Sequence, residues 1–316
     1  MVNNKIGYAC INMALSYPTK YGNKPRGTQP ITTNRSMIKR TFEDKGVDYA
    51  SELILQNVKD LNQIISWNVI NGYDFYRMSS DITPWKTEYE WDDLKDIEQI
   101  RQWFHSAGTM ATTHGIRLTT HPGPFNVLVS PHDHVVDNCV KDLTIHGDVM
   151  DMMGLSRTPY NKINIHLGGV YGDKESAMDR FCKNFYKLPE SVQTRLTVEN
   201  DDKASMYSVK ELYDGIYTRI GIPIVFDYHH HRFCDGGLSE QEALELASST
   251  WGDIKPVVHY SESRSIEQED SKIRPQAHSD YVLDYIDTYG QEVDIMVEAK
   301  MKELAVNKYK ELHNVL

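Results

Sequence analysis

Eight short hydrophobic runs, each ending in polar or metal-binding side chains, constrain the fold of this chain more than any other feature. Helical patterns separate the runs, so strand and helix alternate along the sequence. This alternation is typical of repeated βα units, and eight units in 316 residues predict a closed α/β barrel, the (β/α)8 or TIM barrel. One domain with long loops is expected to span residues 1–316. The runs are 6–12, 75–81, 116–121, 162–169, 195–201, 222–230, 256–262 and 293–300.

The segments between the runs have apolar residues at helical spacing, and several begin after Ser or Asp. Gly72, Gly108, Gly154 and Gly221 stand where helices are expected to end. An open sheet of eight strands is the alternative, but the right-handed crossover rule favours the barrel. Helices are expected around residues 53–65 and over 93–107, 134–153, 175–188, 208–220, 239–249, 279–288 and 302–316.

The longest connection, residues 13–41, follows the first run and contains no acidic residue. The net charge of −11 argues against a nucleic-acid partner. The charge is unevenly distributed, however, because seven Lys and Arg residues precede the first acidic residue, Glu43, so the remainder of the chain carries −18 (−11 less 7). Long connections in compact domains are often functional, and this one is expected on the active face of the barrel. Because Tyr17 and Tyr21 add stacking groups, the segment is a candidate nucleic-acid contact; a mobile surface loop is the alternative.

Histidines and carboxylates gather at the ends of the runs. The carboxyl ends of parallel strands meet at one mouth of a barrel, so these side chains are expected to converge there. Each alone is more simply a structural group, but together they exceed what one tetrahedral ion can use and predict two or three divalent ions. Such clusters serve phosphodiesterases, and a sugar isomerase can use one to polarise a carbonyl. The residues are His121, His166, Glu199, Asp227, His230, His259, His278 and Glu298.

Eight segments in a fixed order over nearly the whole chain carry a resemblance to a known family. They are Gly7-Tyr8 to Asn12, Thr32-Thr33-Asn34-Arg35, His121-Pro122-Gly123, His166-Leu167-Gly168-Gly169 with Tyr171-Gly172-Asp173-Lys174, Glu199-Asn200-Asp201, Asp227 to His231, Val258-His259-Tyr260-Ser261 and Met296-Val297-Glu298-Ala299-Lys300. Together they resemble the UV damage endonuclease family and, more distantly, endonuclease IV and xylose isomerase-like barrels. The resemblance implies a TIM barrel with a multi-metal centre that nicks double-stranded damaged DNA 5′ to the damaged base, leaving a 3′ hydroxyl and a 5′ phosphate.

The resemblance also implies roles for individual residues. The eight strand-end residues above become metal ligands, with Mn2+ the first choice of ion and Mg2+, Zn2+ or Co2+ as alternatives, and Glu199 is also placed in catalysis. Tyr8 and Asn12 match family positions beside the scissile phosphate and the lesion; a packed tyrosine and a turn asparagine are the alternative. Arg35 and Tyr17 are expected to contact DNA. A monomer with no membrane partner is implied, in the cytoplasm or, in a eukaryotic host, the nucleus.

Three positions depart from the family pattern. Asp81 stands where some relatives carry a histidine ligand, and an aspartate can also ligate a hard ion. Pro124-Phe125 replaces a Gln-Tyr pair that pushes into the duplex; Phe125 can still wedge or stack, without the lost hydrogen bonds. Val257 replaces a lysine that can be carboxylated to bridge metals. Two alternatives therefore stay open: a xylose isomerase-like sugar isomerase, and a damage-binding protein with reduced cleavage.

Overall fold

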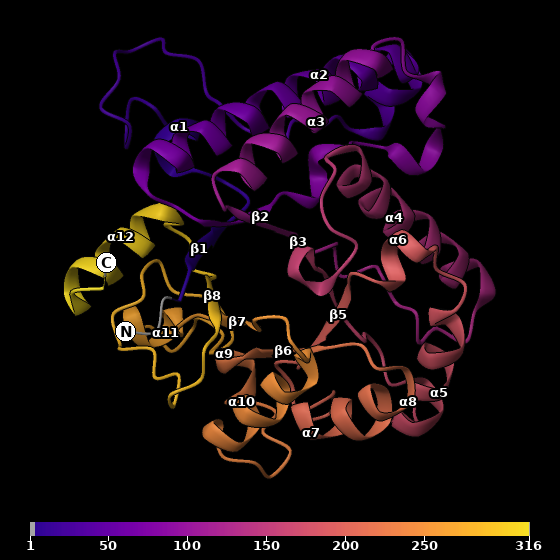
Figure 1. The fold of residues 1–316 in the computed structure, drawn as a ribbon, viewed down its shortest axis with the longest axis vertical. Helices are drawn as coiled ribbons and strands as arrows, with labels where there is room; N and C mark the ends of the chain where they lie inside the picture. Colours follow the sequence, from indigo (N-terminus) through magenta and orange to yellow (C-terminus); the bar gives the residue numbers. More distant parts are fainter. Residues whose placement is uncertain (1–3, 316) are drawn as a thin grey trace.

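The computed structural model describes residues 4–315, in which eight parallel strands close into a barrel inside a ring of helices (Figure 1). Each strand pairs with the next along the chain, and β8 closes the barrel against β1. This confirms the predicted TIM barrel, while the extent of the domain over 1–316 stays a prediction. The strands are β1 Ile6–Ala9, β2 Phe75–Met78, β3 Arg117–Thr120, β4 Ile163–His166, β5 Leu196–Glu199, β6 Ile224–Asp227, β7 Val257–Tyr260 and β8 Asp294–Val297.

Helices cover the outside of the barrel, with the long α2 lying beside α3 on one flank (Figure 1). None of the helices within residues 4–315 is long and apolar enough to cross a membrane. The α-helices are α1 Met13–Ser16, α2 Lys39–Asn71, α3 Ile97–Thr113, α4 Asp133–Met152, α5 Lys174–Phe185, α6 Glu190–Gln193, α7 Val209–Leu212, α8 Thr218–Ile220, α9 Tyr228–His231, α10 Glu240–Ser248, α11 Arg264–Glu267 and α12 Glu303–His313. Short turns of other helix types are η1 Ser80–Ile82, η2 Lys86–Glu88, η3 Trp91–Asp93, η4 Pro159–Asn161, the π-helical η5 Tyr213–Tyr217 and η6 Ser249–Trp251.

The helix expected over residues 279–288 is wrong, because this segment is an irregular loop between β7 and β8. Two carboxylates accept backbone N–H groups of this segment. Glu267 accepts from Asp280 and Tyr281 at 2.7 and 2.9 Å. Glu262 accepts from Leu283 and Asp284, again at 2.7 and 2.9 Å. Side-chain acceptors distant in sequence therefore hold this segment in its non-helical path.

Of the four glycines expected to end helices, Gly108 does not. It lies inside α3, which continues to Thr113 and is followed by Gly115 at φ 67°. Gly72, Gly154 and Gly221 do follow helices, with φ of 73°, 68° and 71°. Gly108 instead allows close packing, since an added Cβ would overlap the backbone carbonyl of Met153 at the end of α4. Packing of α3 against α4, and not chain reversal, explains this glycine.

The interior of the barrel is polar on one side and apolar on the other. Near the amino ends of the strands, Arg117 donates to Asp294 at 2.9 Å, and both side chains are buried. One level higher, Thr197 donates to Asn164 at 2.7 Å. An apolar cluster lies on the other side and includes Val257, the residue that stands where some relatives carry a lysine. The buried members of this cluster are Ala9, Phe75, Val225, Trp251, Val257 and Met296.

We expect Gly108→Ala to destabilise the protein by about 1–3 kcal/mol, because the new methyl group meets the Met153 carbonyl in a packed interface. Urea unfolding measures this change in the free energy of unfolding. Gly123→Ala is the control, since nothing lies within 4 Å of its added Cβ. Equal stability of Gly108→Ala and the wild type would contradict the packing explanation.

Candidate metal centre

Strand register brings predicted ligands into neighbouring positions at the carboxyl-end mouth. His166 is the register partner of Glu199 across β4 and β5. Asp227 is likewise the partner of His259 across β6 and β7. Because each of these residues stands at or next to the end of its strand, closure of the barrel turns separate sequence motifs into one cluster.

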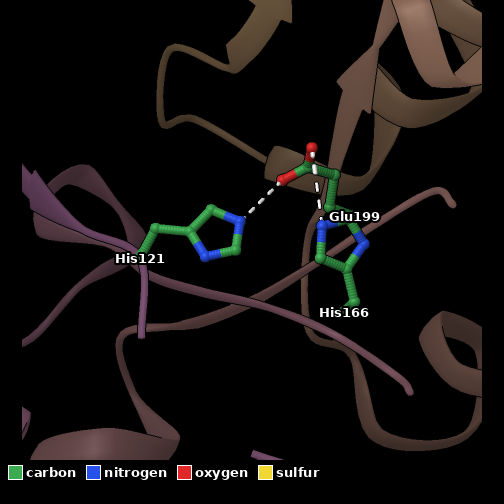
Figure 2. Close-up of side chains that lie close together, drawn as sticks. All are labelled: His121, His166 and Glu199. Carbon is green, nitrogen blue, oxygen red and sulfur yellow. Dashed lines mark hydrogen bonds and ion pairs between the residues drawn. The ribbon is translucent and has the colours of Figure 1, made fainter. Parts of the chain in front are cut away.

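Glu199 occupies the centre of this cluster, and its side chain is 1% exposed. Its Oε2 lies 3.0 Å from His259 Nδ1 and 3.3 Å from His121 Nε2. Its Oε1 lies 3.4 Å from His230 Nδ1 and 3.9 Å from His166 Nε2. Figure 2 shows the imidazoles of His121 and His166 reaching this carboxylate from separate segments of the chain. Four of the five predicted histidines therefore surround one buried carboxylate.

Three overlapping groups of side chains have the spacing of metal ligands, with donor atoms within 4.8 Å of one another in each group. Neighbouring groups share Glu199 or Asp227, and a carboxylate has two oxygens with which to serve two ions. The buried Asp227 Oδ2 has no hydrogen-bond partner, as expected of an atom that ligates an ion. These mixed donors fit divalent ions such as Mn2+, Zn2+ or Mg2+. The groups are His121–His166–Glu199, Glu199–Asp227–His230 and Asp227–His259–Glu298.

His278 lies beside the cluster without joining any of these groups. Its Nδ1 is 2.8 Å from the backbone carbonyl of Glu298 and 3.7 Å from that residue's Oε2. Its role as a ligand stays a prediction. The Glu298 carboxylate is also ion-paired with Arg77 of β2, a residue that the sequence pattern did not single out.

The electrostatics of the cluster oppose full ionisation of every group. Burial raises the pKa of Glu199, but the surrounding imidazoles outweigh it and hold the pKa well below its usual range. Burial raises the pKa of Asp227 to about 6. For His166, Glu199 and Asp201 overcome burial and raise the pKa to about 9, whereas burial lowers the pKa of His259 to about 4. The site thus holds ionised and neutral donors side by side.

A hydrogen-bonded chain orients Glu199 from below. Asn164 donates its amide to Glu199 Oε2, and Thr197 donates to the amide oxygen of Asn164. Both residues were missed as site residues. The available signal was the period of two along a strand: Asn164 precedes His166 by two residues and Thr197 precedes Glu199 by two, so each pair points to the same side.

Asp81 lies outside the three ligand groups. It borders a cavity of about 460 Å³ together with Asp142 and His146. Phe125 borders the same cavity and is 87% exposed, while Pro124 beside it is also exposed. The predicted ligand role of Asp81 therefore gains no support from the geometry, whereas Phe125 is available to stack on a ligand at the mouth.

Tyr8 and Asn12 are buried beside the barrel wall. The Tyr8 hydroxyl donates to Asn68 at 2.6 Å and accepts from Asn12 at 2.9 Å. Asn12 also caps α1 by accepting from the backbone N–H of Leu15. These contacts are those expected of a packed tyrosine and a turn asparagine. The roles of both residues at the scissile phosphate stay predictions.

The two expected DNA contacts in the first connection differ in availability. Arg35 is engaged within the protein: its guanidinium pairs with Asp60 at 2.7 Å and donates to the carbonyl of Thr32 at 2.6 Å. Tyr17 is 49% exposed, with its ring edge-on to Tyr21. Arg35 thus fastens the connection to α2, and Tyr17 remains accessible.

Comparison with known proteins gives consistent matches over nearly the full length. The family model described as UV-endonuclease UvdE matches residues 4–315. The UV DNA damage endonuclease of Bacillus mycoides (strain KBAB4) is 34% identical over 296 residues, covering 89% of this chain and 87% of that protein. The one from Bacillus cereus (strain G9842) is 33% identical over 316 residues, covering 96% of this chain and 92% of that protein.

Solved structures agree with these matches. The crystal structure of SacUVDE superposes with a TM-score of 0.81 at 28% identity, covering 99% of this chain and 100% of that one. An L-ribulose 3-epimerase superposes with a TM-score of 0.52 at 14% identity, covering 81% of each chain. The second likeness shows a shared fold alone.

We expect the metal-free protein to lose stability as the pH rises from about 6.5 to about 9, through His166. The pKa of His166 is raised from 6.5 in the unfolded chain to about 9 in the folded protein. The resulting stability is fully present below pH 6.5 and is lost as the pH rises to about 9. The contribution is on the order of 3 kcal/mol. Urea unfolding in EDTA across this window measures it, with His166→Asn expected to flatten the slope and exposed His114→Asn as the control. An unchanged slope in His166→Asn would contradict the assignment.

Asn164→Leu is expected to weaken Mn2+ binding by about 10–100-fold, because Glu199 loses the amide that orients it. Isothermal titration calorimetry gives the affinity directly. Asn71→Leu, at the exposed end of α2, is the control and should bind Mn2+ like the wild type. Wild-type affinity in Asn164→Leu would show that Glu199 needs no such support.

Proposed function

Because this chain belongs to the UV DNA damage endonuclease family, we propose that it is a metal-dependent DNA repair endonuclease acting on damaged double-stranded DNA. It hydrolyses the phosphodiester 5′ to a UV-damaged base and leaves a 3′ hydroxyl and a 5′ phosphate. The observation that carries the metal-dependent part is the set of three overlapping ligand groups at the barrel mouth. Two or three divalent ions, with Mn2+ first, are the proposed cofactors.

Bound divalent ions supply Lewis-acid activation of a water and a phosphodiester. The protein's contribution is a fixed, buried set of donors. Glu199 stays ionised at neutral pH because its pKa lies well below the usual range, and Asn164 fixes the direction of its carboxylate. Four histidines surround Glu199, of which His259 is fully buried, and the carboxylate itself is 1% exposed. Exclusion of bulk water strengthens electrostatic interactions there.

Damage recognition is proposed to involve the loop after β3. Phe125 presents an exposed ring at the mouth, where it can stack against or wedge between bases. Everting a damaged base costs less than everting a normal one, which contributes selectivity without base-specific contacts. The exposed cations Lys20, Lys24 and Arg26 follow β1 on the same face and suit the phosphate backbone.

Two alternative functions are less well supported. A sugar isomerase shares the barrel, but the epimerase likeness extends to the fold alone, whereas the matched family covers residues 4–315. Phe125 and Val257 motivate the alternative of a damage-binding protein with reduced cleavage. The three ligand groups are nevertheless assembled although Val257 replaces the lysine. A monomer in the cytoplasm or nucleus stays a prediction.

Incubation of UV-irradiated supercoiled plasmid with the protein and Mn2+ is expected to produce nicked circles, resolved on an agarose gel. Glu199→Gln and His230→Ala should each slow nicking by more than about a hundredfold, since both remove a donor of the shared ligand groups. Both variants should still bind the damaged duplex.

The matched control is Glu98→Gln, an exposed carboxylate on α3 that should nick at the wild-type rate. Full incision by Glu199→Gln or His230→Ala would remove that residue from the proposed machinery. Binding without any nicking by the wild type would favour the damage-binding alternative, and absence of both would overturn the proposed function.

A further inference from the structure

Arg77 differs from the other deeply buried arginines of the barrel in how few of its donors are used. Arg117 donates to the carbonyls of Tyr160, Lys255 and Pro159 and to the Asp294 carboxylate. The guanidinium of Arg195 likewise meets three carbonyls and a carboxylate. These two arginines have the saturated hydrogen bonding expected of structural cations.

Arg77, in contrast, donates to one group within residues 4–315, the carboxylate of Glu298. Its side chain is 13% exposed, and its Nε is buried without a hydrogen-bond partner. A guanidinium has five N–H donors in a planar fork, so most of its capacity is unspent. The guanidinium lies beside a carboxylate of the candidate metal centre, and because its Nε is enclosed by protein, the terminal nitrogens are the donors that a substrate at the mouth can reach.

A second cation stands on the same side of the mouth. Lys302 directly precedes α12, and its ammonium makes no close ion pair within residues 4–315. Lys302 lies in the connection from β8 to α12, and the same connection holds Glu298, the carboxylate with which Arg77 pairs. The carboxylate of Glu303, the next residue, does not fully neutralise the charge of Lys302, because it accepts the backbone N–H groups of Met13 and Ala14.

We propose that Arg77 and Lys302 form a phosphate-binding subsite that holds a backbone phosphodiester of the substrate strand beside the metal centre. The inference rests on the proposed function. A fork of free N–H donors matches the oxygens of a phosphate, and a lysine adds a point charge. The loops after the last strands, next to the start of a following helix, are a frequent phosphate site in TIM barrels. Glu298 lies between this subsite and the ligand cluster, and Arg77 keeps its carboxylate oriented.

The test uses a damaged duplex in which one backbone phosphate at a time is replaced by an uncharged methylphosphonate. Binding is measured in EDTA, so the result does not depend on bound ions or on cleavage. At one linkage near the lesion the replacement should weaken wild-type binding by about tenfold. Arg77→Met should bind the ordinary duplex about tenfold more weakly, and the same methylphosphonate should then have little further effect.

Two other variants complete the design. Lys302→Met should weaken binding several-fold and reduce the effect of the same methylphosphonate. Arg157→Met is the matched control, because Arg157 also pairs with carboxylates but lies in the loop before β4, at the opposite end of the barrel. It should retain both wild-type affinity and the full methylphosphonate effect. Melting curves check the fold, and if Arg77→Met does not fold, Arg77→Lys carries the test, since it keeps the charge but loses the fork.

The outcomes separate this inference from the proposed function. If Arg77 and Lys302 variants keep the full methylphosphonate effect at every linkage while the wild type prefers the damaged duplex, the subsite is wrong and the proposed function stands. If the wild type neither prefers nor nicks damaged duplex, both are wrong. Loss of the effect at a single linkage in both variants would establish the subsite.

Discussion

A carboxylate buried among imidazoles is the interaction on which the rest of this structure depends. Glu199 is 1% exposed, and an isolated carboxylate at such a position would cost several kcal/mol in lost hydration. Four histidines from four different βα units offset that cost by approaching within 4 Å. Because none of the four is close to Glu199 in sequence, the interaction requires the closed barrel and its strand register.

The two halves of the barrel interior differ in polarity, and they support Glu199 in different ways. On β3, β4 and β5 the inward positions below the mouth are polar, with Thr119, Asn164 and Thr197 among them. On β1, β2, β6, β7 and β8 the corresponding positions belong to an apolar cluster that includes Phe75 and Met296. TIM barrels usually fill their interior with branched apolar side chains. Here the polar half supplies the hydrogen bonds that orient Glu199, and the apolar half supplies packing.

The periodic features of the sequence predicted most of the fold, because strand and helix periods are local properties. The eight strands and the convergence of His121, His166, Glu199 and His259 follow from them. Contacts between residues far apart in the sequence leave no such local pattern. The carboxylates of Glu262 and Glu267 replace a helix with a loop, and no local pattern distinguishes that segment from a true amphipathic helix. Gly108 was misread because a glycine required for close packing and one that ends a helix look identical in sequence.

The same limit applies to the cations of the site. Arg77 lies within a hydrophobic run where an arginine is expected to snorkel or to pair, and Lys302 follows the Met296–Lys300 segment without any pattern that marks it as a site residue. Their importance lies in what they do not contact. An unsaturated guanidinium can be recognised only after the partners of Arg117 and Arg195 have been seen in three dimensions.

The mouth of the barrel therefore has two chemically different sides. The side formed by β8, β1 and β2 carries Arg77 and Lys302, and the connection after β1 adds exposed cations, anchored where Arg35 pairs with Asp60. The side formed by the loop after β3 carries the exposed ring of Phe125. Backbone phosphates suit the first side and unstacked bases the second. In the proposed function, a strand lying between the two sides presents its phosphodiester to the ligand cluster, and charge on one side and stacking on the other determine the direction in which DNA crosses the site.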